Sequence, residues 1–245
     1  MTRKLTFLLL ALLLFAKPGI AKEIVFAVDA TWPPMEMVNE DREIVGYSID
    51  YMTAAGKEAG FTPVFRNTAW DGIFAGLAAG NYDAICSSVS ITEERKKAMD
   101  FSIPYYEVKQ GLVVPKDSSA KNLEDLKGKT VGAQIGTTGY FAIQEVDGVN
   151  ARSYDEIGLA MQDLYNGQLD GVVCDDPVAA QYALNEPKFA ERMKLVTVIE
   201  SDEPEYYGIA VNKGNEDTLE LINKGIKAVK EKGIEDELKT EWFGL

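Results

Sequence analysis

Residues 88–95 read Ser-Val-Ser-Ile-Thr-Glu-Glu-Arg and combine hydroxyl groups with a guanidinium group. Thr92, followed by Glu94 and Arg95, predicts the start of a helix, where free backbone N–H groups and the helix dipole favour an anion. Arg95 on that first turn can offer two parallel N–H donors to a carboxylate. For an isolated arginine a surface position would be the better interpretation, so an anion site needs support from elsewhere in the chain.

Asp175 supplies the opposite charge, directly after the apolar run at residues 171–174. Its carboxylate could bind an ammonium group, or it could cap the helix that Asp176 and Pro177 begin, a role for which Asp176 competes. A free amino acid presents a carboxylate and an ammonium group a few ångströms apart. A site that brings Arg95 and Asp175 together would therefore suit a zwitterionic amino acid.

Short apolar runs alternate with helical stretches, the pattern of a mainly parallel sheet with helices on its faces. The first series predicts strands at residues 24–28, 64–66 and 84–87 and helices at 48–59 and 71–79. The second series predicts strands at residues 130–134 and 171–174 and helices at 123–126, 140–146 and 155–165. A strand at residues 208–211 and helices at 217–232 and 234–242 follow.

An internal echo favours two halves of like construction. Residues 77–85 and 164–172 share the pattern Leu-x-x-Gly-x-x-Asp-small-β-branched. Any α/β unit in which a glycine ends a helix before a buried strand would also produce this pattern. Ser88 and Asp175 each lie five residues past the Asp of their copy, beyond the carboxyl end of a strand, where ligands bind in such sheets.

The composition excludes several classes of protein. The chain has no histidine, which removes Ser-His and Cys-His nucleophilic catalysis and the commonest zinc sites. Its formal net charge of −14 disfavours nucleic acid and anionic membrane as partners. Cys86 and Cys174 lie in apolar runs and are interpreted as small buried residues, with a disulfide as the less favoured alternative. No metal ion or other cofactor is expected.

The N-terminal segment has the three parts of a secretory signal peptide. Arg3 and Lys4 precede an apolar run at residues 5–16, and small residues stand at the last and third-last positions of the segment. A membrane anchor is the less favoured alternative, because a bilayer span needs ~20 apolar residues. We expect removal of residues 1–21 by cleavage after Ala21, leaving a soluble periplasmic monomer.

Residues 88–106, Ser-Val-Ser-Ile-Thr-Glu-Glu-Arg-Lys-Lys-Ala-Met-Asp-Phe-Ser-Ile-Pro-Tyr-Tyr, closely resemble a family signature. The family is the polar-amino-acid group of periplasmic solute-binding proteins of ABC importers. The further stretches that fit it are Ala-Thr-Trp-Pro-Pro at 30–34, Gly-Tyr-Ser-Ile-Asp at 46–50, Val-Gly-Ala-Gln-Ile-Gly-Thr-Thr at 131–138, Asp-Gly-Val-Val-Cys-Asp-Asp-Pro at 170–177 and Trp-Phe-Gly at 242–244. The resemblance thus covers the whole mature chain.

The resemblance implies an α/β protein with two lobes, the type II periplasmic binding fold, joined by two crossing hinge strands. The crossings are expected near residues 106–111 and 203–208. Lobe 1 would comprise residues 22–107 and 208–245, and lobe 2 residues 108–207. The lobes would close on the ligand by a hinge motion, without covalent chemistry.

The resemblance also implies which residues surround the ligand. They are Asp29, Trp32, Trp70, Ser88, Ser90, Arg95, Gln134, Thr137, Thr138 and Asp175. Arg95 would hold the ligand carboxylate, helped by the four hydroxyl groups of this set, and Asp175 would hold the ammonium group. Trp32 and Trp70 would enclose the ligand side chain, and Asp29, with Gln134 beside it, would contact the tip of that side chain.

The ligand stays open among polar amino acids. Gln134 and Cys174 stand where glutamine-binding members carry a lysine and a histidine, which argues against a strict glutamine receptor. Asp29 with Trp32 and Trp70 suits a cationic side chain, through charge and cation–π contact, although each tryptophan could instead be core packing. We expect arginine, lysine, ornithine or histidine to bind best, with glutamine next.

Three functions of different classes fit these residues. The leading one is a transport receptor that delivers an amino acid to an inner-membrane ABC permease. The second is a periplasmic cyclohexadienyl dehydratase, acting on arogenate or prephenate, which shares the fold and would need an acid, Asp29 or Glu36, to protonate a leaving hydroxyl. The third is a soluble amino-acid sensor. We expect a receptor rather than an enzyme.

Overall fold

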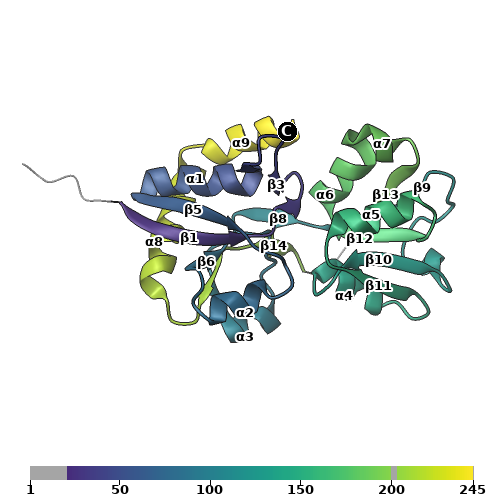
Figure 1. The fold of residues 1–245 in the computed structure, drawn as a ribbon, viewed down its shortest axis with the longest axis horizontal. Helices are drawn as coiled ribbons and strands as arrows, with labels where there is room; N and C mark the ends of the chain where they lie inside the picture. The colour runs from purple at the N-terminus through teal and green to yellow at the C-terminus, as the bar shows by residue number, and fades with distance from the viewer. Residues whose placement is uncertain (1–20, 200–202, 245) are drawn as a thin grey trace, which may run out of the picture.

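The computed structural model describes residues 21–199 and 203–244. Within these residues the strands form two five-stranded sheets, a two-stranded ribbon and a small three-stranded sheet. The two large sheets lie side by side with helices packed on each, and the ribbon runs between them (Figure 1). Body 1 is the sheet that contains the N-terminal strand, with its helices, and body 2 is the other sheet with its helices.

The sheet of body 1 has the strand order β5-β1-β6-β15-β7, in which β1 pairs in parallel with β5 and β6. Its strands are β1 (Lys22–Val28), β5 (Phe61–Asn67), β6 (Ala84–Ile85), β7 (Met99–Phe101) and β15 (Ala210–Asn212). The helices of body 1 are α1 (Tyr47–Ala59), α2 (Ile73–Ala78), α3 (Glu93–Ala98), α8 (Glu216–Glu231) and α9 (Ile234–Phe243). The chain leaves body 1 after β7 and returns to it at β15.

The sheet of body 2 has the order β11-β10-β12-β9-β13, in which β10 pairs in parallel with β11 and β12. Its strands are β9 (Gln110–Pro115), β10 (Thr130–Gln134), β11 (Asn150–Tyr154), β12 (Gly171–Asp175) and β13 (Met193–Ile199). Its helical segments are η1 (Glu124–Leu126), α4 (Thr138–Gln144), α5 (Ile157–Tyr165), α6 (Asp176–Ala180), η2 (Gln181–Asn185) and α7 (Pro187–Ala190).

Two strands cross between the bodies. β8 (Tyr106–Val108) and β14 (Glu205–Tyr207) pair antiparallel and form the ribbon. They fall where the sequence predicts the two hinge crossings, and that prediction is confirmed. The small sheet, β2 (Thr31–Trp32), β3 (Glu36–Val38) and β4 (Ile44–Val45), belongs to the loop between β1 and α1.

Helix α8 shows how the sequence sets the packing of body 1. Ile222, Ile226 and Val229 are fully buried and recur at the spacing of one helix face. Gly225 lies on the same side, against α1, and a Cβ atom there would come within 2.5 Å of the Ala55 carbonyl oxygen. The close approach of the two helices therefore requires glycine at this position.

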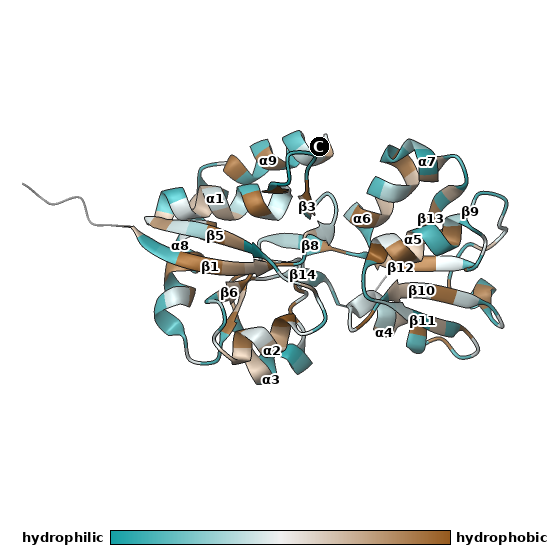
Figure 2. Cartoon of the chain, in the orientation of Figure 1, coloured by the Kyte–Doolittle hydropathy of each residue, from teal (hydrophilic) through white to brown (hydrophobic). Residues whose placement is uncertain are grey.

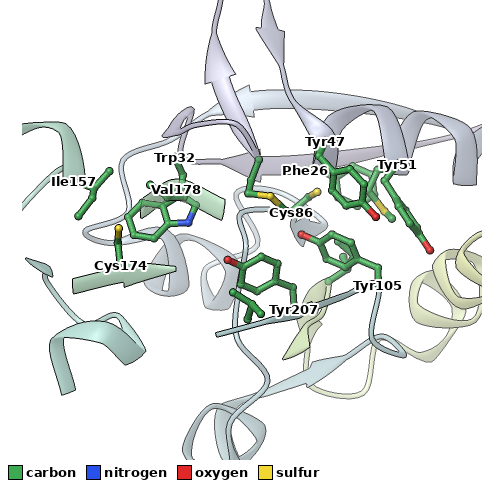
Figure 3. Packing of buried hydrophobic residues seen from close by; sticks show 14 of the residues in the cluster. Phe26, Trp32, Tyr47, Tyr51, Cys86, Tyr105, Ile157, Cys174, Val178 and Tyr207 are labelled. Atoms are coloured by element: carbon green, nitrogen blue, oxygen red, sulfur yellow. The ribbon is translucent and has the colours of Figure 1, made fainter. Parts of the chain in front are cut away.

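The buried apolar residues connect the two bodies. Figure 2 shows them along inner strands such as β1 and β12, with hydrophilic residues on the outer helix faces. One buried cluster contains Trp32 and Tyr207 together with Ile157 and Cys174 of body 2, and Figure 3 shows Trp32 near the last two. The packing thus continues across the hinge into the space between the bodies.

Further predictions concern the two cysteines and the N-terminal segment. Cys86 and Cys174 are buried and free, as interpreted from their apolar surroundings. Residues 1–20, which hold almost all of the predicted signal peptide, lie outside the described residues. Among the residues that the structure does describe, no helix is long and apolar enough to cross a membrane.

Candidate ligand-binding site

A cavity lies between bodies 1 and 2, and all ten predicted site residues line it. The lining residues are Asp29, Trp32, Trp70, Ser87, Ser88, Ser90, Arg95, Gln134, Thr137, Thr138 and Asp175, of which Ser87 was not predicted. The cavity measures about 20 Å³, enough for one water molecule. The structure therefore brings the predicted set together, whereas the roles of these residues toward a ligand stay predictions.

Strand ends place the side chains of this cavity. Asp29 directly follows β1, and Ser87 comes shortly after β6, at the carboxyl ends of parallel strands in body 1. Gln134 and Asp175 are the last residues of β10 and β12 in body 2. The carboxyl ends of both parallel arrays thus meet at the cavity, which is the usual place for a ligand in open α/β sheets.

Arg95 contacts both bodies. Its Nη1 donates to the carbonyl oxygen of Ser90 at 2.9 Å, and its Nη2 donates to the carbonyl oxygen of Gly136 in body 2 at 3.1 Å. Its guanidinium carbon lies 5.5 Å from the ring centroid of Trp70 and 5.2 Å from that of Phe74. A guanidinium has five N–H donors, so this anchoring leaves others for a ligand.

Hydroxyl groups surround Arg95. Thr92 accepts from the Arg95 N–H at 3.2 Å and caps α3, as the sequence predicts. Thr137 caps α4 in the same way, so that helix begins at Thr138 rather than at the predicted residue 140. The Ser90 and Thr138 hydroxyls lie 3.5 Å apart across the two bodies. A carboxylate at this end would find charge and hydroxyl donors together.

The turn at Ser88 is strained. Ser88 has a φ of 48°, a conformation rare outside glycine that clusters at functional sites. Its side chain is buried near Glu36, whose pKa is raised well above its ordinary value by full burial, an effect that the neighbouring Ser88 and Ser48 hydroxyls only partly offset. Glu36 is not one of the cavity-lining residues, so this acid lies beneath the cavity wall.

Asp175 accepts hydrogen bonds from three side chains. Trp32 Nε1 donates to Oδ2 at 3.1 Å, Gln110 Nε2 donates to Oδ1 at 2.6 Å, and the Tyr207 hydroxyl donates to Oδ2. It makes no side-chain hydrogen bond to α6 and therefore does not cap that helix. Asp175 lines the cavity instead. Burial raises the pKa of Asp175, and the charge of Glu205 raises it further. A cation at this point would relieve both effects.

Asp29 is the second acid of the cavity. Its Oδ1 accepts from Thr31 Oγ1 at 2.8 Å and its Oδ2 accepts from Gln134 Nε2 at 2.9 Å, while its backbone N–H donates to Ser87 Oγ at 2.8 Å. Its exposed fraction is 4%, and burial raises its pKa. Neutral donors therefore hold Asp29 without neutralising its charge.

Hydrogen bonds join the two bodies around the cavity. Trp70 Nε1 donates to the Ile135 carbonyl oxygen at 2.9 Å, in addition to the contacts of Trp32 with Asp175 and of Arg95 with body 2. The bodies are therefore in a closed arrangement, and a ligand of amino-acid size must displace some of these internal contacts to enter.

The residues near the hinge that support the cavity-lining side chains were not predicted from the sequence. Gln110 begins β9, and Glu205 and Tyr207 belong to β14; all three bond to predicted site residues. Their inward orientation depends on how β8 and β14 cross, which no local pattern reveals. Ser87 had a detectable signal, because it is the last residue of the strand predicted at 84–87 and stands beside Ser88.

Comparison with known proteins assigns the chain to a family. Residues 24–245 match the family described as bacterial extracellular solute-binding proteins, family 3. The chain belongs to this family. It is 35% identical over 232 residues to the probable histidine-binding protein of Neisseria gonorrhoeae, covering 93% of this chain and 85% of that one. It is 36% identical over 228 residues to ABC transporter arginine-binding protein 1 of Escherichia coli K12, covering 91% of each.

Solved structures agree on the fold. An ancestral arginine-binding protein bound to arginine is 39% identical, with a TM-score of 0.84, covering 91% of this chain and 99% of that one. The ancestral amino acid-binding protein AncCDT-1, a precursor of cyclohexadienyl dehydratase, is 34% identical, with a TM-score of 0.82, covering 90% and 95%. The predicted family and two-lobed α/β fold are confirmed.

Proposed function

We propose that this protein is a periplasmic receptor for a cationic L-amino acid, arginine before lysine, ornithine or histidine, with glutamine next. It would deliver the ligand, as a monomer, to an inner-membrane ABC permease. Two relatives of this chain are named as a probable histidine-binding protein and an arginine-binding protein, which supports this choice, although a further relative is named as an L-cystine-binding protein. Residues 22–107 with 208–245 would move as lobe 1, and residues 108–207 as lobe 2.

The charge pattern of the cavity carries the proposal. Among the residues that the structure describes, one cation, Arg95, and two acids, Asp29 and Asp175, line it. An amino acid with a cationic side chain carries the opposite pattern, one anion and two cations. Buried charges are costly unless paired, so such a ligand would satisfy all three groups. A neutral side chain would leave an acid unpaired, and glutamate would add an anion beside Asp29.

Each part of the ligand has a proposed partner. Arg95 would bind the carboxylate with its remaining N–H donors, assisted by hydroxyl groups from both bodies, namely those of Ser88, Ser90, Thr137 and Thr138. Asp175 would bind the ammonium group. These two contacts would be common to every amino acid, because all amino acids share the groups they recognise.

The other end of the cavity would contact the ligand side chain and determine which side chains are accepted. Trp32 and Trp70 present aromatic faces, and aromatic faces attract a guanidinium or ammonium group. Asp29 would pair with the charge of that group, and Gln134, which already donates to Asp29, would hold the acid in place. Arginine fits best, because its planar guanidinium can both stack on a ring and fork onto a carboxylate.

Ligand capture would follow from hinge closure without a covalent step. The ribbon of β8 and β14 connects the bodies, and contacts such as Trp70 with Ile135 hold them closed. A ligand that bridges Arg95 and Asp175 would add interactions made only in the closed form. It would shift the population toward that form in proportion to this differential affinity.

A thermal-shift screen tests the proposal. Ligands that bind only the folded state raise its melting temperature. Arginine, lysine, ornithine and histidine should give the largest increases, glutamine a smaller one, and glutamate and aspartate none. An increase with glutamate comparable to that with arginine would contradict the assignment, as would the absence of any increase across all the amino acids tested.

The proposal places the protein in the periplasm. The N-terminal segment fits a signal peptide, and the matched family is described as extracellular. N-terminal sequencing of protein released by osmotic shock should find Lys22 as the first residue. A retained Met1 on the exported protein would contradict cleavage after Ala21.

A dehydratase is the second candidate, because AncCDT-1 is described as a precursor of cyclohexadienyl dehydratase. Of the two candidate acids, Glu36 lies beneath the cavity wall, and Asp29 lines the cavity at its side-chain end. We assign the protein to transport because its named relatives are binding proteins. Formation of phenylpyruvate from prephenate, or of phenylalanine from arogenate, would instead support the enzyme.

A further inference from the structure

Glu205 of the hinge strand β14 extends its carboxylate toward the cavity. Its Oε1 accepts hydrogen bonds from Thr138 Oγ1 at 2.7 Å and from Ser90 Oγ at 2.5 Å, and its Oε2 accepts one from Gln110 Nε2 at 3.2 Å. These donors come from body 1, body 2 and the strand that leaves the hinge. Glu205 is therefore held where the two bodies and the ribbon meet.

The donors that hold Glu205 belong to the carboxylate end of the cavity. Ser90 and Thr138 are two of the hydroxyls assigned above to the ligand carboxylate, and both line the cavity. Arg95 is near enough for the charge of Glu205 to oppose the lowering of its pKa by burial. A side-chain carboxylate thus uses the donors that a ligand carboxylate would need.

We propose that Glu205 is an internal competitor that must leave these donors when the amino-acid carboxylate binds, so that it sets the affinity of the receptor. This inference rests on the proposed function. Ser90 and Thr138 would exchange one carboxylate for another, and binding would therefore be weaker than in a site whose donors were free. The exchange would apply to every α-amino acid alike, since it involves the group they share.

The structure offers space for Glu205 to move. A second cavity, of about 840 Å³, lies beside the hinge strand β14, and Glu205 and Thr138 both line it. Lys96 and Lys213 line this cavity too, paired with Glu93 and Asp100 at 2.7 and 2.8 Å, so a carboxylate that rotates into it would meet solvent and the edges of two ion pairs. A side-chain rotation could release the donors without any change in the strand itself.

Withdrawal of Glu205 would also affect Asp175. Both acids accept from the same Gln110 amide nitrogen, at 3.2 Å and 2.6 Å. Two carboxylates around one donor repel each other. Replacing Glu205 by a ligand whose ammonium group lies against Asp175 would exchange that repulsion for an attraction.

Titration calorimetry with arginine and agmatine tests the inference. Agmatine is arginine without its carboxylate, so it cannot take the place of Glu205. Glu205→Ala should bind arginine about tenfold more tightly than the wild type, because charge-assisted hydrogen bonds no longer have to be broken. Glu205→Gln should give a smaller gain in the same direction, and agmatine affinity should not rise in either variant.

Glu107→Gln is the matched control, because Glu107 is exposed on β8 and pairs with Tyr206 of β14. This substitution removes the same charge from the hinge as Glu205→Gln does, and it should leave the affinities for arginine and agmatine unchanged. Unchanged or weaker arginine binding by the folded Glu205 variants would overturn the competitor role alone, and so would an equal gain for agmatine. A wild type that binds no amino acid would overturn this inference and the proposed function together.

Discussion

The two ends of the cavity are built differently. At one end, Arg95 is anchored by carbonyl oxygens of both bodies and Asp175 by donors from three side chains. At the other end, the carboxylate of Asp29 is held by Thr31 and Gln134. In the proposed function, the first end would contact groups that all amino acids share, and the second would contact only the ligand side chain. Affinity and selectivity should therefore be separable by mutation.

Arg95→Ala should have the largest effect and should weaken all amino-acid ligands alike. Loss of one partner of a buried, hydrogen-bonded charge pair costs about 2–5 kcal/mol of binding free energy. Calorimetry with arginine, lysine and glutamine would measure the loss for each. Arg66→Ala, at an exposed arginine of body 1 that donates to the Asn81 carbonyl oxygen, should bind as the wild type does. A loss of affinity confined to one ligand would show that Arg95 does not bind the carboxylate that all amino acids share.

Asp29→Asn should have a selective effect. The amide keeps the size of the side chain and removes its charge, so binding of arginine and lysine should weaken by about 1–3 kcal/mol, as expected for loss of one charged hydrogen-bonding partner. Glutamine should lose much less, and the ratio of the arginine and glutamine dissociation constants should fall. An unchanged ratio would remove Asp29 from the selective role.

The pH dependence of binding should also separate the two ends. Burial raises the pKa of both Asp29 and Asp175, and a cation binds only their ionised forms. Arginine affinity should therefore rise as the pH rises through the raised pKa values, by at most about 1.4 kcal/mol per pH unit for each group. Glutamine, which brings no side-chain cation to Asp29, should show the shallower slope, and a steeper one would contradict the assignment.

The same pKa shifts affect folding with the opposite sign. An acid whose pKa is higher in the folded than in the unfolded state contributes stability below its unfolded pKa, and that contribution is lost as the pH rises through its folded pKa. The melting temperature without ligand should therefore include a term that falls with rising pH, while the increase caused by arginine grows. Melting curves at several pH values, with and without arginine, would check both trends.

Ser87→Ala should have the smallest effect. It removes the hydroxyl that accepts from the Asp29 N–H, so arginine binding should weaken by about 0.5–1.5 kcal/mol, the usual net contribution of one hydrogen bond. Binding constants for arginine and glutamine would show whether the loss stays at the selective end. A loss greater than that of Asp29→Asn would mean that Ser87 itself contacts the ligand.

The predictable parts of the fold are those with a local signal. The strand predicted at residues 130–134 matches β10, and the helix predicted at 48–59 differs from α1 by one residue, because apolar runs end at clear turn residues. The predictions omitted β9 and β13, although both contain apolar runs. β9 pairs with strands distant in sequence, and the chain reaches it through the hinge, where no turn signal precedes the strand.

The site residues also differ in whether a local sequence signal predicts them. Arg95 and Asp175 follow motifs at the ends of predicted strands, and the structure places both at the cavity. Gln110, Glu205 and Tyr207 lie on strands whose inward faces are set by the crossing of β8 and β14, a long-range property. In the sequence, nothing distinguishes Glu205 from the other acidic residues of the chain. Its position beside the site becomes evident only from its hydrogen bonds with Ser90 and Thr138.

The affinities of the wild-type protein for arginine and citrulline would show whether the cavity selects a cationic side chain. Citrulline has nearly the shape of arginine but carries a neutral urea group, so the two differ in the charge that would face Asp29. If one cation and two acids select a ligand of the opposite pattern, arginine should bind at least about tenfold more tightly, since loss of a charged partner costs 1.4 kcal/mol or more. Equal or tighter binding of citrulline would contradict the account.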